Sequence, residues 1–511
     1  MKVAILEPAP IDFHWFHANI RTPHLGPPIL AGILRRAGHE AVVWSEMVAP
    51  IDYGRLAGAD LIGLSLNTTL THQVGYAMAA RVRRLYPTTP LVAGGHHVTM
   101  NVRDGLRHVD YVVRGYAEDA FPALVEELSR GVTTPTTPGV SFRHPVTGEV
   151  VNNPAAGTTG INHLPDLDAV AGYRAHVVGV RWHPAAPATQ LPLSYHSRGC
   201  GFSCHFCSIP LADNPRMSYR SAEAVVADLR YQLGFYRFPF VKPRVWLIDD
   251  NFGQQPAATK DFLRALGDAR LPCRFVVQSR VEVARDPELL ALMRRAGFTN
   301  VYLGIESVNP ESLKSMNKRS DTDKIEAAVR AVQGAGMDVV ALIMIGNDGD
   351  RPGVGARTAR YLESLGVRHM TPQIAVPYPG TEYHRRLAAE GRIFSTDYRR
   401  CNVRPVHFPS AMRPSQVVRE ICALTDRFLS RGRVLAGLLR GDLMTWTSRR
   451  GAIRSGFLRR ALAEIPHLQR FEAPYYDRRH VLDAALARAH AAAGEFAAAA
   501  EPAGPAPVTP A

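Results

Sequence analysis

Three cysteines lie within eight residues in the segment SRGCGFSCHFCSIP, and their spacing could support metal chemistry. Cys200, Cys204 and Cys207 form a C-x3-C-x2-C pattern directly after an expected strand. Three thiolates on one short loop can bind one side of a cubane iron–sulfur cluster. Because no fourth cysteine is near in the sequence, one iron would stay open to a chelating substrate. The pattern therefore predicts a [4Fe–4S] cluster.

A structural zinc site is the alternative for these cysteines. Structural zinc generally takes four ligands in paired C-x2-C or C/H spacing. His205 lies between two of the cysteines and could hardly turn inward with them. The remaining thiols stand alone and are interpreted as ordinary buried residues: they are Cys273, Cys401 and Cys422. The spacing favours the cluster over zinc.

The length and composition indicate a folded protein of two or three domains. The chain has 511 residues, of which 46% are apolar and 21% charged, values usual for globular proteins. Six cysteines are too few for a disulfide framework. No apolar run approaches the roughly 18 residues of a membrane span, and the first residues lack a signal-peptide pattern. We expect a cytoplasmic protein without a membrane span.

The formal net charge of +14 raises the question of nucleic-acid binding. The excess consists mostly of arginines spread through expected helices, and no recognisable binding module accompanies it. Nucleic acid is therefore not an expected partner. An anionic substrate or cofactor would use the same charge.

The first 135 residues alternate short apolar runs with longer amphipathic segments. Continuous Val, Ile and Leu runs between helices are typical of a parallel sheet covered on both faces. Expected strands span 3–6, 41–44, 61–66, 91–93 and 111–113, and expected helices span 27–37 and 71–86. The pattern predicts a Rossmann-like doubly wound domain.

The rest of the chain divides into four parts. Residues 136–190 are rich in Pro, Thr and Asn, with a weak hairpin signal at 140–151, and we interpret them as a linker. Residues 191–400 contain six expected β/α units, which predict a partial or full β/α barrel. The expected strands are 193–196, 244–248, 274–278, 300–304, 338–345 and 371–376, with helices at 222–233, 257–266, 287–296 and 322–335. Residues 401–490 are expected to be mainly helical, and 491–511 a disordered tail.

Over residues 191–400 the chain resembles the radical S-adenosylmethionine (SAM) superfamily. The cysteine pattern, with aromatic Phe206 before its last cysteine, is similar to the family signature. Four further segments follow in the family's order: WLIDDNFG (246–253), FVVQSRVE (275–282), YLGIESVNPESLKSMNKR (302–319) and VPYPGTEY (376–383).

This resemblance implies which residues bind SAM. In the family, SAM binds the open iron, and its reductive cleavage gives a 5′-deoxyadenosyl radical that abstracts hydrogen. Phe206 would pack near the adenine and Glu306 would lie at the mouth of its strand. Candidates for the methionine amino group are Asp249, Asp250 and Asn251, and those for the ribose or carboxylate are Gln278, Ser279 and Arg280. Strand capping and salt bridging are the alternative roles for these polar residues.

In the N-terminal domain, GLSLNTTL (63–70) and LVAGGHHVT (91–99) follow two expected strands. Small residues at strand ends allow the backbone to approach a large ligand, and ligands bind at this edge of a doubly wound sheet. With the flanking segments 22–40 and 109–121, the domain resembles the cobalamin-binding domain of B12-dependent radical SAM enzymes. The matching positions are Ser65, Asn67, Thr68, Gly94, Gly95, His97, Thr99 and Gly115.

Some features depart from related cobalamin domains. The mutases carry D-x-H-x-x-G after the first strand, whereas this chain has Asp12, Phe13 and His14 without the glycine. We therefore expect cobalamin without a histidine ligand, with His14 as the alternative lower ligand. The usual GEGE is here GYAE (115–118). No G-x-G-x-x-G supports a nicotinamide dinucleotide, and the methylthiotransferase branch needs N-terminal cysteines that this chain lacks.

The resemblance implies a cobalamin-dependent radical SAM methyltransferase with a [4Fe–4S] cluster, SAM and cobalamin. Its target would be an unactivated carbon, or a phosphinate phosphorus, of a small-molecule, natural-product or lipid substrate. A flavodoxin or ferredoxin would supply electrons. The alternatives are a non-methylating ring contraction, cyclisation or rearrangement, and a B12- or redox-sensing regulator.

Residues 401–490 are expected to select the substrate. An aromatic and basic group there is either a cap over the barrel mouth or a helix-docking surface: Tyr475, Tyr476, Arg478, Arg479 and His480.

Overall fold

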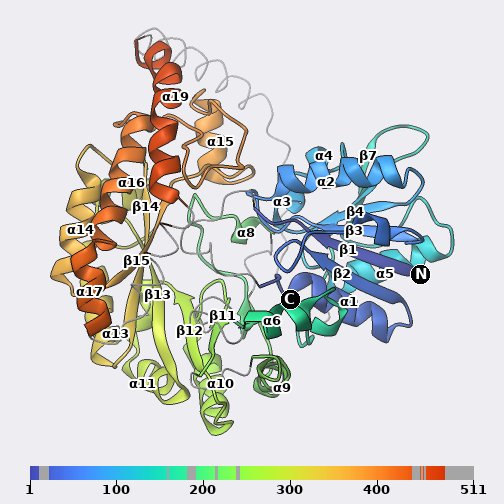
Figure 1. Ribbon diagram of the computed structural model, residues 1–511, viewed down its shortest axis with the longest axis horizontal. Coiled ribbons are helices and arrows are strands. Elements are labelled where there is room, and N and C mark those ends of the chain that lie inside the picture. Colours follow the sequence, from blue (N-terminus) through green and yellow to red (C-terminus); the bar gives the residue numbers. More distant parts are fainter. Residues whose placement is uncertain are drawn as a thin grey trace, which may run out of the picture.

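The computed structural model describes residues 1–10, 22–157, 160–180, 191–212, 217–236, 242–439, 449, 453 and 456–477. These residues form two α/β units, each built on its own sheet, and a helical C-terminal region (Figure 1). The first unit runs from blue to cyan in Figure 1, and the second runs from green to orange. Helix α8 (Ile209–Ala212) lies between the two sheets.

The first sheet has seven strands in the order β2-β1-β3-β4-β5-β6-β7. Its first five strands are parallel, and β6 and β7 continue it as an antiparallel hairpin. The strands are β1 (Lys2–Glu7), β2 (Glu40–Ser45), β3 (Leu61–Ser65), β4 (Leu91–Gly94), β5 (Tyr111–Val113), β6 (Val140–Arg143) and β7 (Val150–Asn152). The weak hairpin signal thus belongs to this sheet, which extends past residue 135, where the sequence predicted a linker.

Helices cover both faces of this sheet, because its strands direct apolar side chains to each face. Val3 and Ile5 pack with α1 and α5, whereas Ala4 and Leu6 pack with α2. The helices are α1 (Gly26–Arg36), α2 (His72–Leu85), α3 (His96–Met100), α4 (Val102–Gly105) and α5 (Ala117–Ser129), with a 3-10 turn at Tyr53–Leu56. The strand order reverses direction between β1 and β3, so the predicted doubly wound domain has its switch point there.

The second sheet has six parallel strands in the order β15-β14-β13-β12-β11-β8. Its two end strands do not pair with each other, so the predicted barrel is a partial one. The strands are β8 (Leu193–Ser194), β11 (Arg244–Leu247), β12 (Arg274–Ser279), β13 (Phe298–Glu306), β14 (Asp338–Ile345) and β15 (His369–Ile374). The first strand, expected over 193–196, ends at Ser194, and a two-stranded ribbon of β9 (Ser197–Arg198) and β10 (Ser218–Tyr219) follows it.

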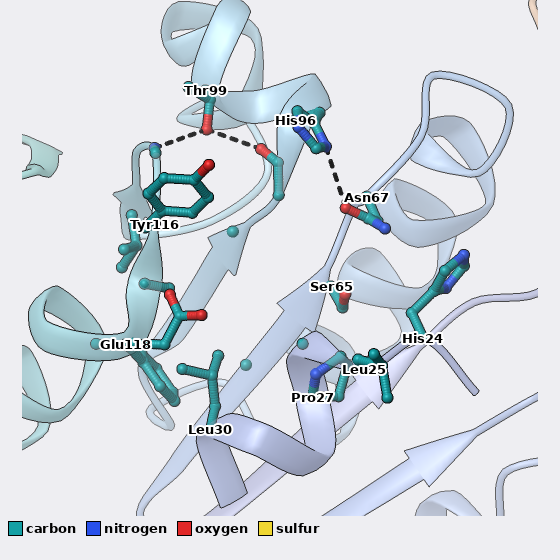
Figure 2. Close-up of a pocket in the computed structure, with 18 of the residues that line it drawn as sticks. His24, Leu25, Pro27, Leu30, Ser65, Asn67, His96, Thr99, Tyr116 and Glu118 are labelled. Carbon is teal, nitrogen blue, oxygen red and sulfur yellow. Dashed lines mark hydrogen bonds between the residues drawn. The ribbon is translucent and has the colours of Figure 1, made fainter. Parts of the chain in front are cut away.

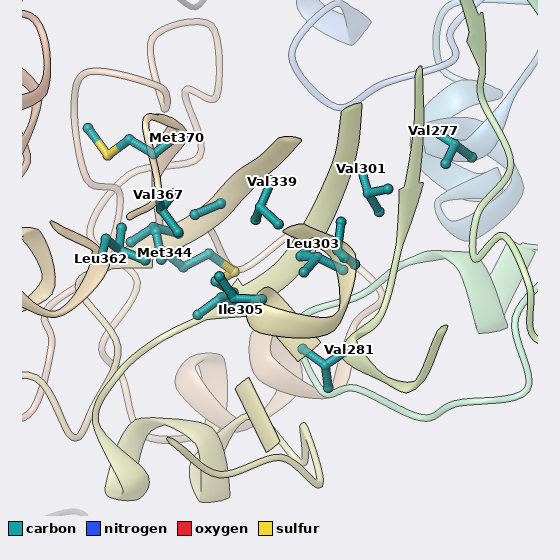
Figure 3. Packing of buried hydrophobic residues seen from close by; sticks show 14 of the residues in the cluster. Val277, Val281, Val301, Leu303, Ile305, Val339, Met344, Leu362, Val367 and Met370 are labelled. Atoms are coloured by element: carbon teal, nitrogen blue, oxygen red, sulfur yellow. The ribbon is translucent and has the colours of Figure 1, made fainter. Parts of the chain in front are cut away.

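Helices pack on the outer face of this sheet. Figure 3 shows side chains such as Val301, Leu303 and Val339 turned into that core. The helices are α9 (Ala222–Leu233), α10 (Pro256–Asp268), α11 (Pro287–Ala296), α12 (Pro310–Ser315), α13 (Thr322–Gly334), α14 (Val354–Ser364) and α15 (Glu382–Ala389). Local signals explain their ends: Asp286 caps α11 through the N–H of Leu289, and Gly297 ends it in the left-handed region.

The C-terminal region is helical, as predicted, with α16 (Pro414–Phe428), α17 (Arg431–Leu439) and α19 (Phe457–Asp477). Helix α16 packs against α14, β15 and α19. The segment between the sheets contains a 3-10 turn (Leu167–Ala169) and α6 (Tyr173–Val180). Among the helices of the described ranges, none is both long and apolar enough to cross a membrane.

Candidate active site between the two sheets

The cysteine loop begins after β9, at the carboxyl end of the second sheet. Cys200, Cys204 and Cys207 are all half-buried free thiols. Burial raises the pKa of Cys200 above its usual value and that of Cys207 to about 12. The thiolate forms therefore need a positive partner at neutral pH, and a coordinated metal supplies one.

Two aspartates at the end of β11 hold the start of this loop. Asp249 is fully buried and accepts hydrogen bonds from the backbone N–H groups of His196 (3.0 Å) and Ser197 (2.6 Å) and from the Ser197 hydroxyl (2.6 Å). Burial raises the pKa of Asp249 to about 6. Asp250 accepts from the N–H of Gly199 (2.8 Å). The loop is thus fixed to the end of the strand whose polar residues the sequence resemblance predicted to bind SAM.

The turn after α12 holds the other side of the loop. The N–H of His205 donates to the carbonyl of Met316 (3.0 Å), and its ring bonds the carbonyl of Ser315 (3.1 Å). Asn317 donates to the carbonyl of Ser203 (2.9 Å). His205 therefore turns toward α12, as its position between the cysteines indicated. Cys273, Cys401 and Cys422 are buried, as expected.

Several residues predicted to contact SAM have structural partners of their own. Asn251 accepts from the N–H of Arg280 (3.1 Å) and donates to Gln254 (2.9 Å). The hydroxyl of Ser279 donates to the carbonyl of Phe252 (2.6 Å). Both oxygens of Asp249 also accept backbone N–H groups. These contacts correspond to the alternative role, strand-end capping, and SAM binding by the three residues stays a prediction.

The remaining predicted SAM residues differ in their surroundings. Glu306 has a positive φ of 63° at a register shift in β13, and it pairs with the buried Lys318 at 2.8 Å. Phe206 packs against the large hydrophobic core. Gln278 is half-buried near the end of β12. The guanidinium of Arg280 contacts Cys204 directly.

A cavity with about 1280 Å³ of empty space, counted out to its open mouth, lies at the carboxyl edge of the first sheet (Figure 2). Six of the eight residues predicted to bind cobalamin line it: Ser65, Asn67, Gly94, Gly95, Thr99 and Gly115. Thr68 and His97 do not. The hydroxyl of Thr68 bonds Thr71, and the ring of His97 is buried against that of His72, with centroids 4.0 Å apart. Its neighbour His96 lines the cavity instead.

The glycines in the cavity wall are needed for close backbone approach. A β-carbon on Gly95, which has φ 108°, would lie 2.6 Å from the carbonyl carbon and oxygen of Leu66. Gly115 also has a positive φ, and its N–H donates to the hydroxyl of Thr99 (3.0 Å). These contacts join the ends of β3, β4 and β5 into one wall.

Sequence reasoning missed a histidine in this cavity. His24 lines the cavity at the start of α1, and its Nδ1 lies 2.5 Å from Oε1 of the buried Glu7 at the end of β1. Burial alone lowers the pKa of His24, but the charge and hydrogen bond of Glu7 outweigh it and raise the pKa. The signal available was a histidine directly before the Leu-Gly-Pro-Pro helix start. His14 lies outside the described residues.

The second domain completes the cavity. Tyr195, Arg198, Ile248 and Asp250 line it from the side of the cysteine loop. Arg198, two residues before Cys200, forms an ion pair with Glu118 of α5. Its guanidinium also donates to the Tyr195 hydroxyl (2.8 Å) and lies 5.1 Å from the ring of Tyr116. The cavity is therefore shared between the two domains, and the cysteine loop begins at its wall.

The residues present fit the implied cofactors. Three thiols on one loop match the three protein ligands of a cluster with an open iron. Among the residues that the structure describes, no three His, Cys, Asp or Glu side chains surround a single-ion position. A cubane does not need that arrangement, because each thiolate binds a different iron. The cavity offers apolar walls and glycine-lined backbone to a large flat ligand.

The aromatic and basic group near the C-terminus is partly described. The ring of Tyr475 stacks on that of Phe408 with centroids 3.7 Å apart, and the Tyr476 hydroxyl donates to the carbonyl of Met412 (2.8 Å). These contacts attach α19 to the segment that precedes α16, which favours the helix-docking interpretation. Arg478, Arg479 and His480 lie outside the described residues.

Comparisons with known proteins agree with this geometry. Residues 194–352 match the radical SAM superfamily, and residues 17–125 match the B12 binding domain. An uncharacterized methyltransferase of Pyrococcus horikoshii is 25% identical over 455 residues, covering 83% of this chain and 94% of the relative. The hopanoid C-3 methylase of Methylococcus capsulatus is 26% identical over 424 residues, covering 81% and 77%.

Solved structures show the same fold. The radical SAM methyltransferase TsrM from Kitasatospora setae, solved with cobalamin and a [4Fe–4S] cluster, has a TM-score of 0.61 at 18% identity and covers 76% of this chain and 78% of that one. The cobalamin-dependent SAM radical enzyme OxsB has a TM-score of 0.63 at 14% identity, covering 96% and 83%. This chain is therefore an enzyme of the radical SAM superfamily that carries an N-terminal B12-binding domain, with a [4Fe–4S] cluster, SAM and cobalamin as its cofactors.

Proposed function

We propose that the protein is a cobalamin-dependent radical SAM C-methyltransferase acting on a small molecule. The observation that carries this proposal is the shared cavity, because one set of walls comes from the B12-binding domain and the other from the segment that leads into Cys200. When bound, the cluster supplies a SAM-derived radical and cobalamin supplies a methyl carrier. A reaction that needs both requires them to face one substrate.

The protein's own residues would position these groups and exclude water. Asp249 and Asp250 hold the cysteine loop from one side. The turn after α12 holds it from the other side. The apolar side chains of Ile5, Leu30 and Phe121 line the cavity from β1, α1 and α5. Such walls suit a planar apolar group and keep water away from a reactive radical.

The relatives support methyl transfer and narrow the substrate class. Methylases of hopanoids and methyltransferases of bacteriochlorophyllide d are among them. The hopanoid C-2 methylase of Rhodopseudomonas palustris is 31% identical over 215 residues, 41% of this chain and 40% of the relative. We propose a carbon atom of a largely apolar, ring-containing small molecule as the methyl acceptor. We expect this carbon to be unactivated, because the enzyme would then need a radical step to break its C–H bond.

The experiment uses reconstituted full-length enzyme, reductant, methyl-labelled SAM and apolar extracts or candidate ring compounds. Methyl transfer predicts S-adenosylhomocysteine and 5′-deoxyadenosine in comparable amounts, together with a product that carries the label. Product without label, or 5′-deoxyadenosine without S-adenosylhomocysteine, would contradict it.

A second candidate is a non-methylating conversion. Anaerobic magnesium-protoporphyrin IX monomethyl ester cyclases are also relatives, at 23% and 22% identity. The same experiment separates the two, since only methylation adds the mass of one CH2 unit to the substrate. We further propose that a flavodoxin or ferredoxin delivers the electrons and that the protein works in the cytoplasm.

A further inference from the structure

The guanidinium of Arg280 makes a direct contact with the cysteine loop. Arg280 directly follows β12, and its Nη1 donates to Sγ of Cys204 at 3.1 Å. Only 6% of the residue is exposed. The sequence resemblance placed Arg280 on SAM's ribose or carboxylate, but this hydrogen bond goes to a cysteine that binds the cluster.

Other contacts hold this guanidinium in place. Its Nε and Nη2 donate to the carboxylate of Glu282 at 3.1 and 3.2 Å, and Nη2 also donates to the carbonyl of Lys318 at 2.6 Å. The centre of the guanidinium lies 3.8 Å from the ring of Phe202, within the cysteine loop. Nη1 therefore cannot leave Cys204 without disturbing contacts to three other residues.

The turn that supplies the Lys318 carbonyl has an unusual backbone. Asn317 and Arg319, on either side of Lys318, have positive φ values of 52° and 56°. This conformation brings the Lys318 carbonyl to Arg280 and the Lys318 ammonium to Glu306. Positive φ at non-glycine residues persists only where surrounding contacts maintain it. The position of Arg280 is thus built into the fold around the loop.

A fixed positive donor at a ligand sulfur has an electrostatic consequence. One-electron reduction of a [4Fe–4S] cluster adds a negative charge that spreads onto its sulfur ligands. A hydrogen bond and a positive charge at such a sulfur stabilise the reduced form more than the oxidised form. Burial strengthens the effect, because water screens the charge less.

We propose that Arg280 is a positioning residue that raises the reduction potential of the cluster through its hydrogen bond to Cys204. This role is separate from methyl transfer and from SAM binding. It concerns how easily an external one-electron donor reduces the cluster from the 2+ to the 1+ state.

The test is an anaerobic redox titration, followed by electron paramagnetic resonance, of the reconstituted full chain without SAM or cobalamin. Arg280→Gln is expected to shift the midpoint potential to more negative values at unchanged iron content. Arg280→Lys keeps the charge but loses the planar fork, so its shift is expected to be smaller. Arg264→Gln is the matched control: this arginine lies on α10, is 46% exposed and pairs with surface carboxylates.

A further variant tests the sign and does not depend on Arg280 variants assembling a cluster. Glu282→Gln removes the negative partner of the guanidinium and is expected to shift the potential to more positive values. The proposal is overturned if the potentials of Arg280→Gln and Arg280→Lys equal that of the wild type. It is also overturned if Glu282→Gln shifts the potential downward or leaves it unchanged. Because no SAM or substrate is present, none of these outcomes depends on methyl transfer.

Discussion

The carboxylate of Asp249 illustrates how single residues build this site. It lies at the end of β11, where strand spacing predicts a polar group, and the sequence resemblance assigned it to SAM. In the structure both of its oxygens accept hydrogen bonds from the segment that leads into the cysteine loop. Spacing locates the end of a strand, but it does not tell whether a carboxylate there binds a ligand or its own backbone.

Asp249→Asn is expected to weaken this attachment. The amide keeps one acceptor oxygen but turns an NH2 group toward a buried N–H donor, which costs about 1–3 kcal/mol of unfolding free energy. Chemical denaturation measures the loss, and the iron content after reconstitution should fall with it. Asp268→Asn, at the exposed end of α10, should change neither quantity. Full iron content at wild-type stability would contradict the structural role of Asp249.

The cysteines give the simplest residue-level prediction. Cys207→Ala removes one of the three ligands, so visible absorption and iron content of the reconstituted protein should fall to a small fraction of the wild-type values. Cys273→Ala, at a buried thiol on the outer core, should retain both. Equal iron in the two variants would show that the loop does not hold the cluster.

The pair of His24 and Glu7 predicts a pH-dependent contribution to stability. The folded-state pKa of His24 is raised above 6.5, so the protonated histidine is stabilised by folding. This contribution is fully present below pH 6.5 and is lost as the pH rises through the folded-state pKa. The difference in unfolding free energy between the wild type and His24→Gln should therefore shrink from acid to alkaline pH. A difference that is constant between about pH 5.5 and 8.5 would exclude this linkage.

At the scale of elements, the sequence predicted the main strands and helices because apolar periodicity is local. It also predicted the GLSLNTTL and LVAGGHHVT strand ends, whose glycines and small polar residues line the cavity. It did not separate His96 from His97, since the choice between cavity and core depends on where α3 begins. The β6–β7 hairpin was only weakly indicated, because its place in the sheet depends on a long-range pairing with β5.

Gly95 lies in the turn between β4 and α3 and forms part of the cavity wall. Alanine there would need a strained φ and would clash with the backbone of Leu66, so the β4–α3 turn must move out of the cavity wall. We expect Gly95→Ala to weaken cobalamin binding at least about tenfold, equivalent to about 1.4 kcal/mol, in an absorbance titration.

Gly38→Ala is the matched control for Gly95→Ala. Gly38 also has a positive φ, but nothing lies within 4 Å of its missing β-carbon. It should lose about 1 kcal/mol of stability from strain and bind cobalamin normally. Equal cobalamin affinity of the two variants would contradict the close approach at Gly95.

At the scale of the whole molecule, the ion pair of Arg198 and Glu118 joins the two domains. Their side chains are 17% and 6% exposed, and the pair lies between the B12-binding domain and the cysteine loop. The sequence predicted each domain but not this contact, because nothing local to either segment specifies its partner. The shared cavity was likewise outside the reach of sequence patterns.

Breaking this pair from one side should be costly. Arg198→Met leaves the Glu118 carboxylate buried without its partner and should lower the unfolding free energy by about 3–5 kcal/mol. The double variant with Glu118→Leu should recover most of this loss, because it removes both charges. Denaturation of the four proteins gives the coupling energy. Additive losses in the double variant would mean that the pair does not couple the domains.

We infer that one chain holds two metal centres, each in its own domain, next to one shared cavity. Elemental analysis of the reconstituted protein tests it most directly. We predict four irons and one cobalt per chain for the wild type, loss of iron but not cobalt in Cys207→Ala, and a lower cobalt content at unchanged iron content in Gly95→Ala. A wild-type protein that binds iron but no cobalt, or variants that lose both metals together, would contradict the account.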